Sequence, residues 1–272
     1  MPSRVEAHAL GRWKLVPFKA DHAVLEHQIG RTSFDVISGV RAHVDASSAS
    51  FSIETYEECS AETIEHCIYD LILPCLLAFD GQLVLHGGLS FTGDSAVGFI
   101  GESGQGKSTL VAGLHGLGWP LMGDDAFTLE LCDDACSARS VYASRRLFPD
   151  SVVSLFPAGH ETAPMAHYSE KRRVSFSAGP RSAPLRAIIR LGDEEPNIHI
   201  QELSLAEACM ALVSNSFILD PEDTAQNKAK FQLASEAAKT IPVYDLHYPR
   251  RYDRMHNVRD AIADKLGVSS IQ

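Results

Sequence analysis

The chain has 272 residues, of which 45% are hydrophobic and 22% charged, and its formal net charge is −11. This composition is typical of a folded globular protein, and the length suits one large domain or a small domain joined to a medium one. The negative charge argues against a nucleic-acid partner and against an anionic membrane surface, because both are bound mainly through Lys and Arg.

Apolar and polar residues alternate in short groups over residues 1–58, which predicts several short β-strands. Over residues 61–78 the apolar residues recur at helical spacing. We therefore expect a β-rich region with its helix over residues 1–80, and an α/β catalytic domain over residues 81–272. The further predicted elements follow in chain order: strands at 81–91 and 95–101, a helix at 107–117, strands at 119–122, 127–131, 184–191 and 197–203, a helix at 204–215, a helix from Asp220, a strand at 241–248 and a helix at 255–266.

Local signals add detail to this division. The segment "SLAE" at 204–207 is a capping box, and "DPED" places Asp220 at an N-cap. The turn sequence "GDEEP" at 192–196 favours pairing of the strands on either side of it. Residues 132–182 are rich in Ser, Ala, Arg and Pro, so we expect loops with little regular structure there.

Targeting and cysteine patterns indicate a cytoplasmic protein. The first residues lack the continuous apolar core of a signal peptide, and no stretch reaches the roughly 18 apolar residues of a membrane span. The six cysteines form no C-x-x-C pair, so we expect free thiols and no metal site among them.

The segment "GESGQGKS" matches the phosphate-binding pattern G-x-x-x-x-G-K-[ST], between a predicted strand and a predicted helix. Glycines let backbone N–H groups converge on a phosphate, and the helix N-terminus adds partial positive charge. We expect Lys107 to be an exposed loop residue that reaches the β and γ oxygens, and Ser108 to bind Mg²⁺. ATP and Mg²⁺ are thus the predicted cofactors, and the nucleotide is assigned to Gly101, Glu102, Ser103, Gly104, Gln105, Gly106, Lys107, Ser108 and Thr109. A glycine-rich turn without a ligand is the alternative.

Two acids, Asp124 and Asp125, follow the short strand at 119–122. We expect this strand to lie beside the one that precedes the loop, which would bring the acids near the phosphates. One carboxylate can then help to hold Mg²⁺ while the other accepts a proton from an incoming hydroxyl; a solvated acidic turn is the alternative. His86, in the strand at 81–91, is either structural or close to the γ-phosphate.

The stretch "LHGGLSFTGDSAVGFIGESGQGKSTLVAGLHGLGWPLMGDD" resembles the HPr kinase/phosphorylase family, which has a His-Gly before a hairpin, a G-x-x-G-x-G-K-S loop and a strand ending in Asp-Asp. The resemblance implies an α/β fold with a P-loop kinase core related to HPr kinase and phosphoenolpyruvate carboxykinase, and a small N-terminal β-rich region. It also implies that Asp125 takes the serine proton, that Asp124 lies on the metal side with Ser108, and that His86 helps to arrange the phosphate end.

The sequence departs from the HPr enzymes after the acids. It lacks their "E-x-R-G-x-G" segment and has "SVYASRRLFPDSVVSLF" and "SEKRRVSF" instead. With "LSLAEACMALVSNSF" and "IPVYDLHYPRRYDRM", this arrangement more closely resembles the HPr-kinase-like enzymes of ribosomal peptide pathways. Some of these, the lasso-peptide tailoring kinases, phosphorylate the C-terminal serine of a precursor peptide.

Cations stabilise the charge that phosphoryl transfer spreads over the equatorial oxygens. Arg146 is the candidate for this role, and a basic segment is the candidate for a substrate carboxylate: Lys171, Arg172 and Arg173. A solvated basic turn is the alternative for each, and it is favoured for Arg250 and Arg251.

The sequence therefore predicts a Mg-ATP-dependent serine kinase that acts on the C-terminal serine of a ribosomal precursor peptide. A small protein with an acceptor serine, as in an HPr-type kinase, is the first alternative. A nucleotide-binding switch or scaffold with little catalysis is the second. We expect a homo-oligomer with no nucleic-acid and no membrane partner.

Overall fold

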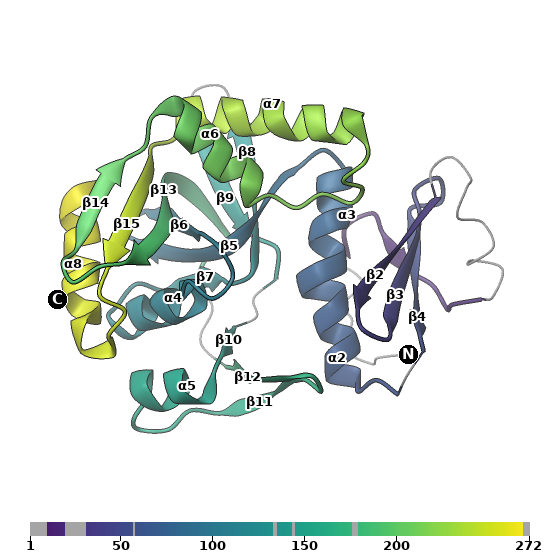
Figure 1. Cartoon of the computed structure of the whole chain (residues 1–272), viewed down its shortest axis with the longest axis horizontal. Helices are drawn as coiled ribbons and strands as arrows, with labels where there is room; N and C mark the ends of the chain where they lie inside the picture. Colours follow the sequence, from purple (N-terminus) through teal and green to yellow (C-terminus); the bar gives the residue numbers. More distant parts are fainter. Residues whose placement is uncertain are drawn as a thin grey trace.

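The computed structural model describes residues 10–19, 31–56, 58–132, 135–142, 145–175 and 179–268. Residues 1–9, 20–30 and 57 of the predicted N-terminal region lie outside this described part. The fold is a mixed α/β arrangement of three sheets with helices between and around them (Figure 1). Within the described residues, no helix has the length and apolar character that crossing a membrane requires.

The largest sheet has the strand order β14-β15-β13-β6-β5-β8-β9, and β7 pairs with β5. The start of β13 also pairs with β9, so the strands from β13 to β9 close on themselves. The bounds of these strands are β5 Leu83–Thr92, β6 Ser95–Ile100, β7 Leu121–Gly123, β8 Ala126–Cys132, β9 Ala135–Ser140, β13 Ser182–Glu194, β14 His199–Glu202 and β15 Val243–Tyr248.

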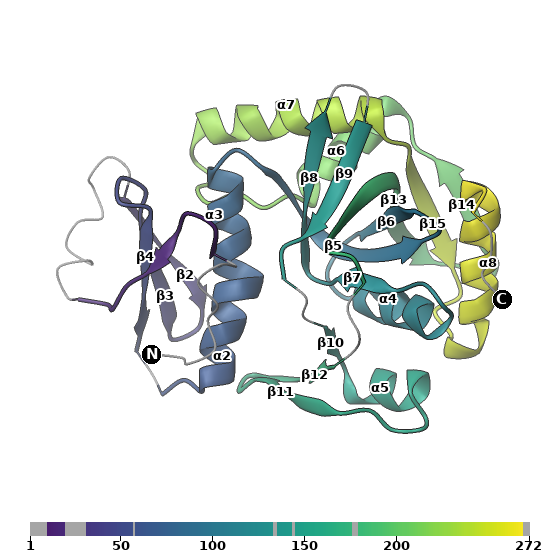
Figure 2. The same cartoon turned by 180° about the vertical axis from the view of Figure 1, so that it is seen from behind.

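Two pairs of helices cover this sheet, as Figure 2 shows from behind. Helices α6 (Leu205–Ser214) and α7 (Thr224–Thr240) bury apolar side chains against one face. Helices α4 (Lys107–Gly116) and α8 (Met255–Leu266) pack on the other. The predicted capping box starts α6, and the final helix has its predicted bounds.

A second sheet lies at one end of the molecule, in the order β1-β4-β3-β2. Its strands are β1 Lys14–Leu15, β2 Arg31–Ile37, β3 Val40–Asp45 and β4 Ser50–Thr55. A helical stretch separates this second sheet from the large sheet (Figure 1). It consists of α2 Ala61–His66, the π-helix η2 Cys67–Ile72 and α3 Leu73–Phe79, and it shares an apolar core with the second sheet. Because Pro74 has no N–H for the carbonyl of Asp70, the wider π-helical turn forms just before it. The domain division at residue 80 stays a prediction.

A third sheet, in the order β10-β12-β11, lies with a short helix below the large sheet (Figure 1). Its elements are β10 Arg146–Leu147, α5 Pro149–Leu155, β11 Thr162–Ala166 and β12 Ser169–Val174. The prediction of loops over residues 132–182 is therefore wrong. These strands are short, and β10 and β12 carry charged residues, so the sheet lacks the apolar alternation by which strands are recognised.

Two other predictions of detail are wrong. The strands on either side of "GDEEP" do not pair with each other, because β15 lies between them, parallel to β13 and antiparallel to β14. Helix α7 begins at Thr224 with Asp223 as its N-cap, and Asp220 precedes it. The prediction that the cysteines remain thiols is confirmed, since none of the six forms a disulfide bond.

Candidate active site

The glycine-rich segment forms the connection between β6 and α4. Gly106 is the N-cap of α4 at φ 86°, a left-handed conformation that favours glycine. No described side chain caps α4, so its first N–H groups are open to an anion. Upstream in the loop, the amide of Glu102 donates to Oε1 of Gln105 at 2.7 Å. The loop is thus held by its own polar groups while the helix end remains available.

Lys107 is buried, with 8% of its surface exposed, and not an exposed loop residue as we expected. Its Nζ donates to the carbonyl oxygens of Gly101 at 2.7 Å and Glu102 at 2.9 Å. Burial lowers the pKa of Lys107, and the charges of the two neighbouring acids offset part of this effect. The ammonium group therefore lies folded over the inside of the loop, where its hydrogen-bond partners among the described residues are carbonyl oxygens.

Asp124 and Asp125 connect β7 to β8. The prediction that their strand lies beside the strand before the loop is wrong, because β5 lies between β7 and β6. Asp124 nevertheless reaches α4, because Gly88 of β5 has no side chain. A Cβ at Gly88 would lie 2.9 Å from the side chain of Val111 and 3.3 Å from Oδ1 of Asp124. The "HGG" motif thus leaves room for an acid to approach the helix.

Asp124 is a buried carboxylate that accepts a hydrogen bond from the side chain of Ser108. Burial and the charge of Asp125 raise the pKa of Asp124 to about 7, although the Ser108 bond lowers it in part. Within the described residues, Asp124 forms no ion pair. The charge of Arg146 acts on Asp124 from a distance, but no described basic group pairs with its carboxylate at the place where the sequence predicts a cation.

Asp125 has the opposite environment, because Arg146 of β10 forms a two-point ion pair with it. Nε of Arg146 donates to Oδ2 at 2.6 Å, and Nη2 lies against Oδ1. Burial raises the pKa of Asp125, but Arg146 outweighs this and holds the pKa below its usual value. The backbone of Asp125 lies at φ 70°, in the left-handed region that a non-glycine residue seldom adopts. Asp125 is thus an ionised carboxylate held at one place in the site.

The helical stretch at the second sheet supplies further partners of Arg146. Nδ1 of His66 lies 2.7 Å from Nη1 of Arg146 and 2.8 Å from the carboxylate of Asp70. Asp70 itself forms an ion pair with Arg146 at 3.6 Å. Sequence reasoning missed both residues, although a lone Asp in the apolar run "CIYDLILPCLLAF" indicates a buried cationic partner.

We expect Asp70→Asn to lower the free energy of unfolding by about 1–3 kcal/mol, because it removes a charge from a buried, hydrogen-bonded ion network. Denaturant unfolding followed by circular dichroism measures this. Asp35→Asn is the matched control, since Asp35 pairs with Arg41 at the surface and is 65% exposed. The control should change stability by less than about 1 kcal/mol. Equal losses in both variants would contradict a buried network at Asp70.

His86 lies within β5 and is half-buried. It borders the same space as Gly101, Glu102 and Ser103, the first residues of the glycine-rich loop. Burial, followed by the charge of Lys107, lowers the pKa of His86 to about 4, so the ring is neutral at pH 7. Its backbone N–H donates to the carbonyl of Asn215 at 2.7 Å. The Asn215 side chain in turn accepts from the amide of Gly101 at 3.0 Å. Asn215 is a site residue that no sequence signal indicated, and it joins the segment after α6 to the start of the loop.

The three basic residues of β12 point to different neighbours. Lys171 lies close enough for its charge to act on Asp125, His86 and Lys107. Arg172 donates to Oγ1 of Thr162 at 3.3 Å. Arg173 pairs with Glu65 of α2 at 2.5 Å. Of the three, Lys171 is the cation that the structure brings to the acids.

The residues present fit a magnesium ion that is shared with a nucleotide. Among the residues that the structure describes, no cluster of three or more His, Cys, Asp or Glu side chains suits a metal ion. Asp124 and Ser108 offer one carboxylate and one hydroxyl oxygen. Mg²⁺ is commonly held by one or two carboxylates together with phosphate oxygens and water. Its charge would also neutralise the buried Asp124.

Comparisons with known proteins leave the family open. No family model matches the chain, and no curated protein matches it in sequence. The chain is similar in structure to the HPr(Ser) kinase/phosphatase from Coxiella burnetii, with 12% sequence identity and a TM-score of 0.37. The similarity covers 67% of this chain and 95% of that chain. A TM-score this low assigns no function, which therefore rests on the site.

Proposed function

We propose that this protein is a Mg-ATP-dependent kinase that phosphorylates a serine hydroxyl. The observation that carries the proposal is the pair of adjacent buried acids beside the phosphate-binding pattern. Asp124 faces Ser108 and forms no ion pair among the described residues, whereas Asp125 is ionised and held by Arg146. Two acids in opposed environments suit two roles, one toward a cation and one toward a proton.

In this proposal the loop and the first turn of α4 bind the phosphates. Lys107 exchanges its two carbonyl partners for phosphate oxygens. Asp124 with Ser108 would hold Mg²⁺, which would supply positive charge toward the phosphates. The serine oxygen attacks the γ-phosphorus, its proton passes to Asp125, and ADP leaves. Arg146 keeps the Asp125 carboxylate in place, and Lys171 adds positive charge near it.

A nucleotide-binding switch without chemistry is less well supported. Binding phosphate requires the loop, the helix end and Lys107, but it does not require a second buried carboxylate. Asp125 has a left-handed backbone and forms an ion pair with the buried Arg146. Such strain is maintained when the surrounding structure and a function require it. This favours an enzyme.

For the acceptor, we propose a peptide whose last residue is the serine to be phosphorylated. Lys171 is the candidate for its terminal carboxylate, because Arg172 and Arg173 are already bonded to Thr162 and Glu65. Such a cation beside Asp125 would place a serine hydroxyl and a terminal carboxylate of the same residue at neighbouring positions. An HPr-type protein acceptor lacks this carboxylate, so the two acceptors are separable by experiment.

We expect a peptide ending in free serine to be phosphorylated about 10–100-fold faster than its C-terminal amide, since a charge-assisted hydrogen bond is worth about 1.5–3 kcal/mol. Mass spectrometry on both peptides with ATP and Mg²⁺ measures the rates, with purified HPr as a competing acceptor. Equal rates on both peptides, or a preference for HPr, would exclude the terminal-carboxylate acceptor. Absence of transfer to any of the three would count against a serine kinase.

A further inference from the structure

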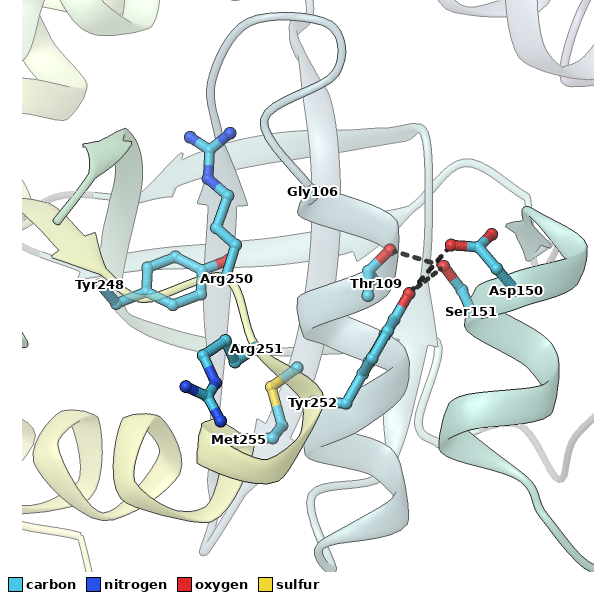
Figure 3. Close-up of a pocket in the computed structure, with 9 residues that line it drawn as sticks. All are labelled: Gly106, Thr109, Asp150, Ser151, Tyr248, Arg250, Arg251, Tyr252 and Met255. Atoms are coloured by element: carbon cyan, nitrogen blue, oxygen red, sulfur yellow. Dashed lines mark hydrogen bonds between the residues drawn. The ribbon is translucent and has the colours of Figure 1, made fainter. Parts of the chain in front are cut away.

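A cavity of about 230 Å³ lies beside the first turn of α4. Figure 3 shows its walls, which come from three parts of the chain that are distant in sequence. The residues that matter here are Gly106 and Thr109 from the loop and α4, Ser151 from α5, and Tyr248, Arg250 and Tyr252 from the end of β15 and the segment that joins it to α8. Asp124, Asp125 and His86 are not among the residues that line this cavity.

The two ends of the glycine-rich loop border different cavities. Its first residues, Gly101 to Ser103, line a space of about 360 Å³ together with His86. Its last residue, Gly106, lines the cavity of Figure 3. A nucleoside triphosphate is also asymmetric, with the reacting phosphate at one end and the nucleoside at the other. If the reacting phosphate lies toward His86 and the acids, the nucleoside lies toward Gly106.

We propose that the cavity of Figure 3 binds the base and ribose of the nucleotide, an inference that rests on the proposed kinase function. Its walls have the chemistry that a nucleobase requires. Tyr252 offers an aromatic ring, and the guanidinium of Arg250 offers a planar cation, whereas Tyr248 is buried and only borders the space. Bases stack on both kinds of group. Tyr252 is 37% exposed, so part of its ring is free to accept a stacked base.

Contacts across the cavity hold these groups in place. The Tyr252 hydroxyl lies 3.1 Å from Oγ of Ser151 and donates to Asp150 at 3.3 Å. Arg250 donates from Nη2 to the carbonyl of Gly192 at 2.8 Å. The aromatic and cationic walls are therefore fixed from α5 on one side and β13 on the other. The carboxylate of Asp150 is exposed at the rim, where it can accept hydrogen bonds from ribose hydroxyls.

The test compares two probes, ATP and inorganic tripolyphosphate, which share phosphates but differ in the nucleoside. We expect Tyr252→Ala to weaken ATP binding about 10–100-fold, because base stacking on an aromatic side chain is lost. Tripolyphosphate binding should stay unchanged in the same variant. Tyr252→Phe, which keeps the ring, should restore most of the ATP affinity. Titration calorimetry in the presence of Mg²⁺ measures the dissociation constants of ATP and of tripolyphosphate for the unchanged chain and for both variants.

Tyr56→Ala is the matched control, since Tyr56 is 58% exposed and follows β4 at the far sheet. It should bind ATP as the unchanged chain does. An unaltered ATP affinity in Tyr252→Ala would overturn the nucleoside assignment, and so would equal weakening of ATP and tripolyphosphate. If the unchanged chain bound neither probe, the proposed function itself would fail together with this inference.

Discussion

The variant Asp125→Asn should bind nucleotide normally but transfer phosphate to serine about 10²–10⁴-fold more slowly, the range expected for the loss of a general base. The amide keeps the size and shape of the carboxylate but cannot take up the serine proton. Asparagine also tolerates the left-handed backbone that Asp125 adopts at φ 70°. The change keeps the backbone of the connection between β7 and β8, but it also removes the charge that pairs with the buried Arg146, so the unfolding of the variant is measured beside its activity. Transfer from labelled ATP, followed at saturating ATP, measures the effect.

Asp124→Asn is the matched comparison, because the neighbouring acid differs in environment and not in type. It removes the carboxylate that lies beside Ser108, so we expect a higher Mg²⁺ requirement. The effect should diminish as the Mg²⁺ concentration rises, whereas the defect of Asp125→Asn should not. The two roles are reversed if Asp124→Asn abolishes transfer at every Mg²⁺ concentration while Asp125→Asn remains active.

Sequence reasoning predicted the parts of the site that are close together along the chain. The loop, Lys107 and the two acids belong to one stretch of strand, helix and strand, whose patterns are local. The neighbour of β7 could not be predicted in this way. The hairpin of β5 and β6 places β5 between β7 and the loop strand, and only the missing side chain of Gly88 restores the contact between acid and helix.

The partners of Arg146 depend on contacts over long sequence distances. Asp125, His66 and Asp70 come from different elements, separated from Arg146 by 21 to 80 residues. Single-residue patterns contain no information on such pairings. The charge of Asp70 within an apolar run was a usable signal, since burying an unpaired carboxylate is costly. Its partner was not predictable, because β10 has only two residues and lies in a segment that resembles a loop.

Clusters of like charge in the sequence were a weaker guide. Lys171, Arg172 and Arg173 lie on one strand, where successive side chains point to opposite faces. Arg172 therefore points away from the face that Lys171 and Arg173 share, and Arg173 is paired with Glu65, so the three do not form one anion site. Arg250, whose sequence context favoured a solvated turn, instead borders the cavity beside α4. Position on an element decides what a basic side chain can bind.

The last prediction concerns Lys107, whose buried position determines which variant is informative. Lys107→Ala would leave a cavity and two carbonyl groups without their partner, so a loss of activity could follow from a loss of structure. Lys107→Met keeps the apolar stem and removes the ammonium group alone. We expect Lys107→Met to reduce phosphoryl transfer at least about 10²-fold, because a positioned charge on the β and γ oxygens is lost.

The measurement pairs transfer from labelled ATP with thermal unfolding of the same variant. Because methionine keeps the apolar stem, Lys107→Met should lower the unfolding temperature less than Lys107→Ala does, although the carbonyl groups of Gly101 and Glu102 lose their partner in both variants. Transfer should fall in both. Binding of tripolyphosphate should weaken too, because the lysine acts on phosphates and not on the nucleoside. This separates it from Tyr252, whose replacement should affect ATP alone. A Lys107→Met variant that is folded and fully active would remove the loop from the mechanism and, with it, the kinase proposal.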